Sequence, residues 1–302
     1  MVLRHLLDVD DLSSDELALV LDRSEHQNPP LLLERHGTAL LFEKPSARTR
    51  SSMEVAVVQL GGHPVTIRGE EVGFDTRETV EDVTRTLCCY HSVIGARVFE
   101  HNTVERMAAV SSVPLVNLLS DRAHPVQALA DLLTLRQRWG GLDGRSIAFV
   151  GDGDNNVCRS LMIACALAGV EVRVASPAGH QPAAEATDRA RAHGGTITVT
   201  DQPAEAVKGA DAVYTDVWVS MGQTGEAEER RAAFEGFTVD DDLMSSANEH
   251  AVFLHCLPAH RGEEVAASVI DSAASAVWPQ AENRLHTARG LLWWLVERSQ
   301  GD

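Results

Sequence analysis

Two hydrophobic rhythms alternate along this chain. Short runs rich in Val, Ile and Leu are followed by longer stretches in which apolar residues recur every three or four positions, as on one face of a helix. In the first half this pattern predicts strands over 37–43, 63–67, 92–97 and 114–118, and helices over 46–60, 78–89, 104–111 and 125–139. Strands that alternate with helices are typical of a parallel sheet flanked by helices.

A glycine-rich segment at 139–144 interrupts the pattern and indicates a domain junction. Beyond it the alternation resumes, with predicted strands over 146–150, 171–175, 196–200, 211–215 and 252–254, and helices over 156–168, 183–193 and 282–298. We therefore expect an α/β protein with two doubly wound parallel-sheet domains, residues 1–138 and 139–285, and an active site in the cleft between them.

The length and charge of the chain narrow its possible partners. Its 302 residues suffice for one large or two ordinary domains. With 44 acidic and 26 basic residues the net charge is −18, which argues against binding to nucleic acid or to an anionic membrane. The same charge would repel a phosphorylated substrate unless its site were locally basic. We expect solvated surfaces where acidic residues gather, at Asp8, Asp10, Asp11, Asp15 and Glu16 and at 240–242.

The chain shows no sign of a membrane or of an oxidising environment. No apolar run approaches the length of a membrane-spanning helix, and the first residues carry no leader pattern, so we expect a cytoplasmic protein. Five cysteines without paired spacing favour a reducing compartment and give no zinc pattern, and we expect no metal and no cofactor. Cys88, Cys89 and Cys165 lie in apolar helical stretches and are expected in the core.

The segment Ser-Ala-Arg-Thr-Arg at 46–50 follows a predicted strand and opens a helix. Hydroxyl groups, two guanidinium groups and the amides of a helix start together suit a phosphate dianion. Taken alone, a helix-capping Ser46 followed by surface arginines is the more common arrangement. Arg97 closes another predicted strand, and we expect it at the carboxyl edge of the sheet, where ligands bind.

Three further motifs follow in order: His-Pro-Val-Gln at 124–127, Asp-Val-Trp-Val-Ser-Met-Gly at 216–222 and His-Cys-Leu-Pro at 255–258. Together with 46–50 they resemble the ornithine carbamoyltransferases, and the resemblance runs nearly from end to end. Aspartate-using relatives carry His-Pro-Leu-Pro at the last motif. The resemblance implies transfer of the carbamoyl group of carbamoyl phosphate to the δ-amine of L-ornithine, giving L-citrulline and phosphate in arginine metabolism. It also implies a homotrimer or a multiple of trimers.

The resemblance assigns the first domain to carbamoyl phosphate, together with a C-terminal helix over 286–302 that packs back on it. The implied contacts come from Ser46, Ala47, Arg48, Thr49, Arg97, His124, Gln127, Cys256, Leu257 and Arg284. Ala47 stands where the family usually has Thr, at a position that contributes mainly its backbone. Independently of the resemblance, His124 and Gln127 lie three residues apart at a helix start and therefore share one face.

The second domain is assigned to ornithine, with contacts from Asn156 (or its neighbour Asn155), Asp216, Ser220 and Met221. The amine of ornithine must lose a proton before it attacks, and Asp216 and Cys256 are placed to steer it. Catalytic roles are implied for Arg48, Arg97, His124, Asp216 and Cys256. One departure is Gly73, near a position where the family usually has a Gln that reaches a neighbouring active site, and it leaves the acceptor amine open.

Three other functions compete with this interpretation. A different acceptor, such as putrescine, would keep the same chemistry. A non-catalytic ligand-binding homologue would have a degenerate site, whereas every expected catalytic residue type is present. A dinucleotide-dependent oxidoreductase is disfavoured because the segment 151–156 lacks the third glycine of the dinucleotide fingerprint, and no acidic residue follows the predicted strand at 171–175 to bind a ribose.

Overall fold

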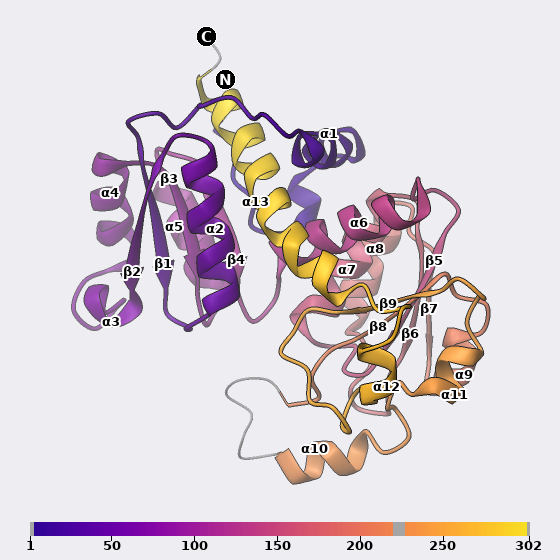
Figure 1. Cartoon of the computed structure of the whole chain (residues 1–302). Coiled ribbons are helices and arrows are strands. Elements are labelled where there is room, and N and C mark those ends of the chain that lie inside the picture. The colour runs from indigo at the N-terminus through magenta and orange to yellow at the C-terminus, as the bar shows by residue number, and fades with distance from the viewer. Residues whose placement is uncertain (1–2, 220–226, 301–302) are drawn as a thin grey trace. The chain divides into compact units, whose positions relative to one another are not determined.

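The structure is a computed structural model that describes residues 3–219 and 227–300 (Figure 1). The chain divides into two compact units. The first comprises Met1–Ala130 with Glu282–Asp302, and the second is Asp131–Ala281. The division falls inside two helices, α6 (Pro125–Trp139) and α13 (Val277–Gln300).

The first unit is built on four parallel strands in the order β2-β1-β3-β4. Helices cover both faces of this sheet (Figure 1): α4 and α5 pack on the face that carries Leu41 and Ile94, and α2 packs on the other. The strands are β1 (Gly37–Phe42), β2 (His63–Arg68), β3 (His91–Arg97) and β4 (Leu115–Leu119). The helices are η1 (Val9–Asp11), α1 (Ser14–Glu25), α2 (Ala47–Gln59), α3 (Gly69–Val72), α4 (Val80–Tyr90) and α5 (His101–Val110).

The C-terminal part of α13 belongs to the first unit and packs on α1. At Gly290 the two helices are so close that an added Cβ atom would lie 2.7 Å from the carbonyl oxygen of Val20 and 2.8 Å from the amide nitrogen of Ser24. Beside this contact, Arg289 Nη2 donates to the carbonyl oxygens of Ser24 and His26, each at 2.8 Å. The prediction that the C-terminal helix packs back on the first domain is therefore confirmed.

The second unit contains five parallel strands in the order β7-β6-β5-β8-β9. Nearly every residue of α7 is buried, as expected for a helix enclosed by the sheet and its neighbours. The strands are β5 (Ser146–Val150), β6 (Glu171–Ala175), β7 (Ile197–Thr200), β8 (Ala212–Thr215) and β9 (Val252–His255). The helices are α7 (Asn156–Leu167), α8 (Ala184–Ala192), α9 (Pro203–Val207), α10 (Ala227–Ala233), α11 (Asp241–Ser245) and α12 (Ala267–Ile270).

Every predicted strand and helix is present, and both sheets are parallel as predicted. The sequence interpretation missed α1 and the short helices α3 and α9 to α12. It also began the last helix at 282, whereas α13 begins at Val277. Pro279 lies in the first turn of α13, where a proline removes an amide that has no partner within the helix.

The expectation that the N-terminal acidic residues are solvated is wrong for Asp8, whereas Asp11 and Asp15 are exposed as expected. Asp8 is only 4% exposed and caps η1, where its carboxylate accepts the amide of Val9 at 2.9 Å. The carboxylate of Asp11 accepts the amide of Asp8 at 3.1 Å, and that of Glu16 accepts the amide of Ser13 at 3.0 Å. These acids hold helix starts, because a carboxylate satisfies amides that lack a partner there.

One cysteine expectation is also wrong. Cys165 is buried, but Cys88 is half-buried and Cys89 is exposed. The buried stripe of α4 runs through Val80, Val83, Thr84 and Leu87, so the two adjacent cysteines lie beside it.

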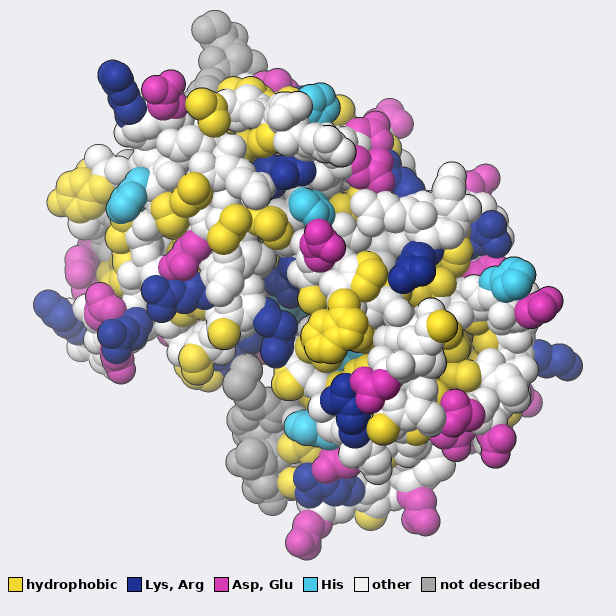
Figure 2. All heavy atoms as spheres, viewed as in Figure 1, with side chains coloured by type: hydrophobic (Ala, Val, Ile, Leu, Met, Phe, Trp, Pro, Cys, Tyr) yellow, Lys and Arg dark blue, Asp and Glu magenta, His cyan; other side chains and the backbone are white. Residues whose placement is uncertain are grey.

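The surface carries charges of both signs. On the face shown in Figure 2, Lys and Arg side chains are interspersed with Asp and Glu side chains, so the net negative charge does not gather in one area of that face. Among residues 3–219 and 227–300, no helix is long and apolar enough to cross a membrane.

Candidate active site

Each sheet has one point at which the strand order reverses. In the first unit it lies between β1 and β3, and in the second between β5 and β8. In open α/β sheets, ligands bind outside the carboxyl ends of the strands at such points. Thr49 and Arg97 belong to the first reversal point, and Asn155 and Asp216 follow the strands of the second. The predicted site residues therefore stand where the topology of each unit favours a ligand.

The segment at 46–50 forms the start of α2. Ser46 caps the helix, and its hydroxyl accepts the amide of Thr49 at 3.3 Å. The amides before Thr49 have no acceptor within a helix, so they can bind an anion. Ala47 and Arg48 are exposed beside these amides, whereas Thr49 is buried. The capping serine and the anion site are thus compatible functions of one helix start.

Two buried arginines converge on Thr49. Arg284 Nη2 donates to its hydroxyl at 3.2 Å and Arg97 Nη1 at 3.5 Å. Arg284 Nη1 also donates to Gln127 Oε1 at 2.5 Å. All four residues are less than 8% exposed. The structure therefore brings residues from four distant segments, two of them motifs, into one cationic cluster, which we call the arginine cluster (Thr49, Arg97, Gln127 and Arg284).

His124 adjoins the arginine cluster at the start of α6. It is buried, and this burial, with the positive charges of Arg284 and Arg97, holds the pKa of its imidazole well below the ordinary value. A histidine in this setting is neutral near pH 7. It can donate one N–H to a carbonyl oxygen without adding a further charge to the cluster.

Lys44 is a cation that the sequence interpretation did not single out. Its ammonium group lies 4.8 Å from the centre of the Phe99 ring, a cation–π arrangement. Burial and the nearby charge of Arg97 lower the pKa of its amine. Its position two residues before Ser46 could have identified it as a candidate site residue from the sequence.

In the second unit, Asn155 and Asp216 are joined directly. Asn155 caps α7 by accepting the amide of Cys158 at 2.7 Å, and its side-chain nitrogen donates to Asp216 Oδ2 at 3.3 Å. Asn156, the first choice from the sequence, is half-buried at the first position of the same helix. Asn155 thus positions the carboxylate that is predicted to face the acceptor amine.

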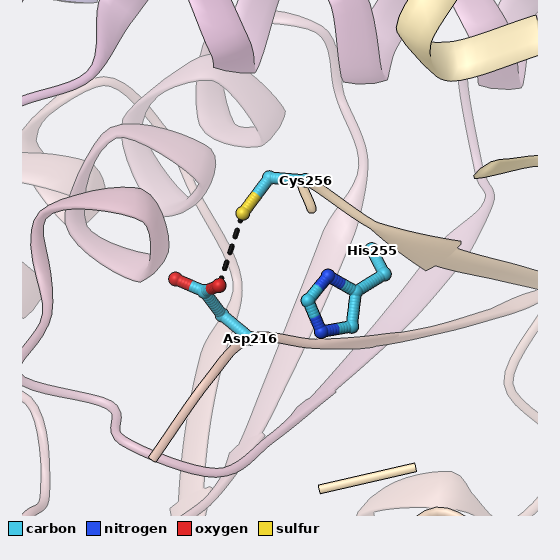
Figure 3. Close-up of side chains that lie close together, drawn as sticks. All are labelled: Asp216, His255 and Cys256. Carbon is cyan, nitrogen blue, oxygen red and sulfur yellow. Dashed lines mark hydrogen bonds between the residues drawn. The ribbon is translucent and has the colours of Figure 1, made fainter. Parts of the chain in front are cut away.

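Cys256 and Asp216 point toward one another from the ends of β9 and β8, as Figure 3 shows. The thiol of Cys256 donates to Asp216 Oδ1 at 3.0 Å, and the same oxygen accepts the amide of Val217 at 2.8 Å. Asp216 is 7% exposed. A thiol, a carboxylate and the amide of Asn155 therefore form a small polar group with negative charge, suited to a cationic side chain.

The backbone beside Cys256 has an unusual conformation. The Leu257-Pro258 peptide is cis, and Leu257 has a positive φ of 59°. The amide of Leu257 donates to His255 Nδ1 at 2.9 Å. Gln280, which no motif identified, accepts the amide of His255 at 2.9 Å and donates to Tyr214 at 3.2 Å.

The glycine-rich loop 151–156 packs against other residues of the second unit. Asp152 forms a buried ion pair with Arg230, whose Nε donates to the carbonyl oxygen of Trp218 at 2.6 Å. Burial raises the pKa of Asp152. At Gly153 an added Cβ would lie 2.6 Å from Pro182. Close packing of the loop against Pro182 is therefore sufficient to explain why position 153 is glycine, without a bound ligand.

Within residues 3–219 and 227–300, two groups of side chains have a spacing that would suit a metal ion. The donor atoms of Asp216, His255 and Cys256 lie within 4.8 Å of one another, as do those of His260, Glu263 and Glu264. Both ring nitrogens of His255 already face hydrogen-bond partners, so a metal in the first group would have to displace them. That the reaction needs no metal stays a prediction, and the predicted contacts from Ser220 and Met221 lie outside the described residues.

The sequence matches two family models that together span most of the chain. Residues 4–137 match the aspartate/ornithine carbamoyltransferase carbamoyl-P binding domain. Residues 143–295 match the Asp/Orn binding domain of the same family.

Named relatives and solved structures agree with these matches. The chain is 49% identical to an ornithine carbamoyltransferase of Acidothermus cellulolyticus, over 99% of both sequences, and 48% identical to that of Thermus thermophilus, over 97% of both. The crystal structure of ornithine carbamoyltransferase from Thermus thermophilus has a TM-score of 0.89 and 46% identity, covering 98% of this chain and all of that one. That from Pyrococcus furiosus has a TM-score of 0.92 and 44% identity, covering 96% of each.

Proposed function

Because the chain belongs to the aspartate/ornithine carbamoyltransferase family, we propose that it transfers the carbamoyl group of carbamoyl phosphate to the δ-amine of L-ornithine. The products are L-citrulline and phosphate. The observation that carries this choice of acceptor is the hydrogen bond between Cys256 and Asp216. A carboxylate beside a thiol and a neutral amide suits a cationic amine, whereas the carboxylates of an aspartate acceptor would require basic groups.

We assign carbamoyl phosphate to residues 1–138 with the helix 286–302. Its phosphate lies at the start of α2, where the amides, the hydroxyl of Ser46 and Arg48 face the anion. Arg97 faces both the phosphate and the carbamoyl oxygen and stabilises the charge that develops there. Arg284, which precedes the helix 286–302, contacts the carbamoyl group. The neutral His124 donates to the carbamoyl oxygen, and Gln127 holds the carbamoyl amine. The contacts of Arg284 with Thr49 and Gln127 support this assignment, because they hold the guanidinium group in place before the substrate binds.

We assign ornithine to residues 139–285. Asn156 takes the α-amino and carboxylate end, with Asn155 as the alternative, and Asp216 takes the side-chain amine. Ser220 and Met221 complete this set. Cys256 and Leu257 contact the carbamoyl group as well, since they end the strand beside Asp216.

The reaction is a substitution at the carbonyl carbon. The δ-amine first loses a proton. Asp216 and Cys256 orient the amine and relay this proton. The amine nitrogen then bonds to the carbonyl carbon, and the bond from that carbon to the phosphate oxygen breaks. The nitrogen passes its second proton to the departing phosphate. Both substrates must be bound together, and their orientation supplies a large share of the rate enhancement.

We further propose that the chain acts as a cytoplasmic homotrimer, or a multiple of trimers. All five cysteines lie among the described residues and are thiols, which supports a reducing compartment. The loop 72–77 supports the oligomer, because its residues 75–77 are exposed yet the loop is held by Arg106, whose guanidinium group binds Asp75 and Glu81 at 2.5 and 2.7 Å. Sedimentation of a monomer at working concentration would refute this proposal.

The test of the acceptor is a carbamoyl-transfer assay with ornithine, putrescine, acetylornithine and aspartate as alternative amines. We expect citrulline from ornithine, with a kcat/KM at least about a hundredfold above that for any other amine. A preference for putrescine would overturn the choice of ornithine and leave the carbamoyl chemistry intact. No product with any amine would overturn the function itself.

A further inference from the structure

A buried carboxylate, Glu264, contacts His255, the residue that precedes Cys256, and the proposed reaction gives it no role. Glu264 is completely buried. Its Oε1 atom lies 3.2 Å from His255 Nε2 and accepts the amide of His260 at 2.5 Å. Its other oxygen, Oε2, is buried without a hydrogen-bond partner among the described residues. Because burying a carboxylate costs desolvation free energy, the burial of Glu264 calls for a compensating role.

The contacts of His255 define its protonation. Nδ1 accepts the amide of Leu257 at 2.9 Å and therefore carries no proton. In a neutral imidazole the proton must then be on Nε2, which faces Glu264 Oε1. The carboxylate thus fixes both the tautomer and the plane of the ring, as carboxylates do for histidines that must be oriented.

The segment from Leu257 to His260 is held at both ends by this pair. The amide of Leu257 is bound by His255, and the amide of His260 is bound by Glu264. Leu257 adopts a positive φ of 59°, a conformation that is unfavourable for a residue with a side chain and persists only where the surroundings impose it. Glu264 and His255 are the surroundings that impose it.

We propose that Glu264 is a positioning residue for carbamoyl transfer, acting through His255 to hold Cys256 and Leu257 in the geometry that the substrates require. This proposal rests on the proposed function, which makes Cys256 and Leu257 substrate contacts. Glu264 itself touches no substrate. Its role is to keep the Nε2–H tautomer of His255 and the backbone turn that follows.

The test compares two variants of similar volume. In Glu264→Gln the amide oxygen can replace Oε1 and keep both hydrogen bonds, and its nitrogen takes the place of the unbonded Oε2. In Glu264→Leu both acceptors are lost. Glu263→Gln is the matched control, because Glu263 is the adjacent residue and pairs at the surface with Arg231 at 3.1 Å.

We expect Glu264→Leu to lower kcat/KM for ornithine about tenfold or more, as for the loss of a buried charge-assisted hydrogen bond. We expect Glu264→Gln to stay within about threefold of the parent, and the control to match it. A purely structural role would reduce the folded fraction and leave KM unchanged. We therefore also measure KM for both substrates and the rate at which iodoacetamide alkylates Cys256 in the folded protein, which needs no turnover. Both should change in Glu264→Leu.

Parent-like kinetics and alkylation in folded Glu264→Leu would overturn the proposal, as would equal losses in the Gln and Leu variants. If Glu264→Leu does not fold, Glu264→Ala replaces it, and if neither folds the carboxylate serves folding and the proposal is overturned. A parent protein that forms no citrulline would refute the proposed function separately, while the alkylation rates would still report on Glu264.

Discussion

The arginine cluster has a direct consequence for the pH dependence of stability. Burial and the charges of Arg284 and Arg97 keep the pKa of His124 well below its ordinary value of 6.5 in the folded protein. In the unfolded chain His124 takes up a proton as the pH falls through that value. The unfolded state then binds more protons than the folded state, so stability is lost as the pH falls from 6.5 toward the folded pKa.

The magnitude follows from the linkage relation. A shift of one pKa unit corresponds to about 1.4 kcal/mol, and an unfolded histidine is already half protonated at its pKa. The free energy of unfolding should therefore fall by about 1 kcal/mol between about pH 6.5 and pH 5.5 through His124 alone. In His124→Gln this contribution disappears, while a polar side chain of similar length remains.

The assay is urea unfolding of parent and variant at one protein concentration, from about pH 8 to pH 5.5, so that effects of association cancel in the difference. Phosphate is left out, because an anion in the site would offset the charge of the arginines. The exposed His63, substituted by Gln, controls for the loss of a histidine as such. A stability difference between parent and His124→Gln that does not change with pH would refute the reasoning.

Two further predictions concern the thiol and the helix contact. Cys256→Ala should raise the KM for ornithine and lower kcat, each by about tenfold, and should weaken carbamoyl phosphate binding less than ornithine binding, because the thiol donates to Asp216. Steady-state kinetics with an unchanged ornithine KM would contradict this. Gly290→Ala should destabilise the first unit by about 1 kcal/mol or more, since overpacking against Val20 and Ser24 exceeds the gain of about 1 kcal/mol in helix propensity; a melting temperature equal to or above that of the parent would contradict it.

Much of the fold could be predicted, because the two hydrophobic rhythms separate strands from helices along the chain. The N-terminal helix α1 was not predicted, because its acidic residues were interpreted as a solvated surface. Ser13 and Glu16 nevertheless form a capping box that marks its start. The short helices α9 to α12 are too brief to show a helical period.

Site residues that directly follow strands could be predicted from the sequence, since the ends of parallel strands meet at one edge of the sheet. The residues that hold those site residues in place could not be predicted. Gln280 acts on His255, and Arg230 on Asp152, only because the fold brings together positions far apart in the chain. Glu264 follows the His-Cys-Leu-Pro motif within a few residues, so its position in the sequence was suggestive. Its role depends on its burial, however, and the sequence did not predict that burial.

The central claim is that the first unit binds carbamoyl phosphate and the second binds ornithine. Calorimetric titration of carbamoyl phosphate into the parent, Arg48→Ala and Asp216→Asn tests it most directly, because each variant alters one unit. We expect Arg48→Ala to weaken binding at least about tenfold, since a charge-assisted contact is lost, and Asp216→Asn to bind as the parent does. Parent-like binding in Arg48→Ala, or an equal loss in Asp216→Asn, would contradict the account.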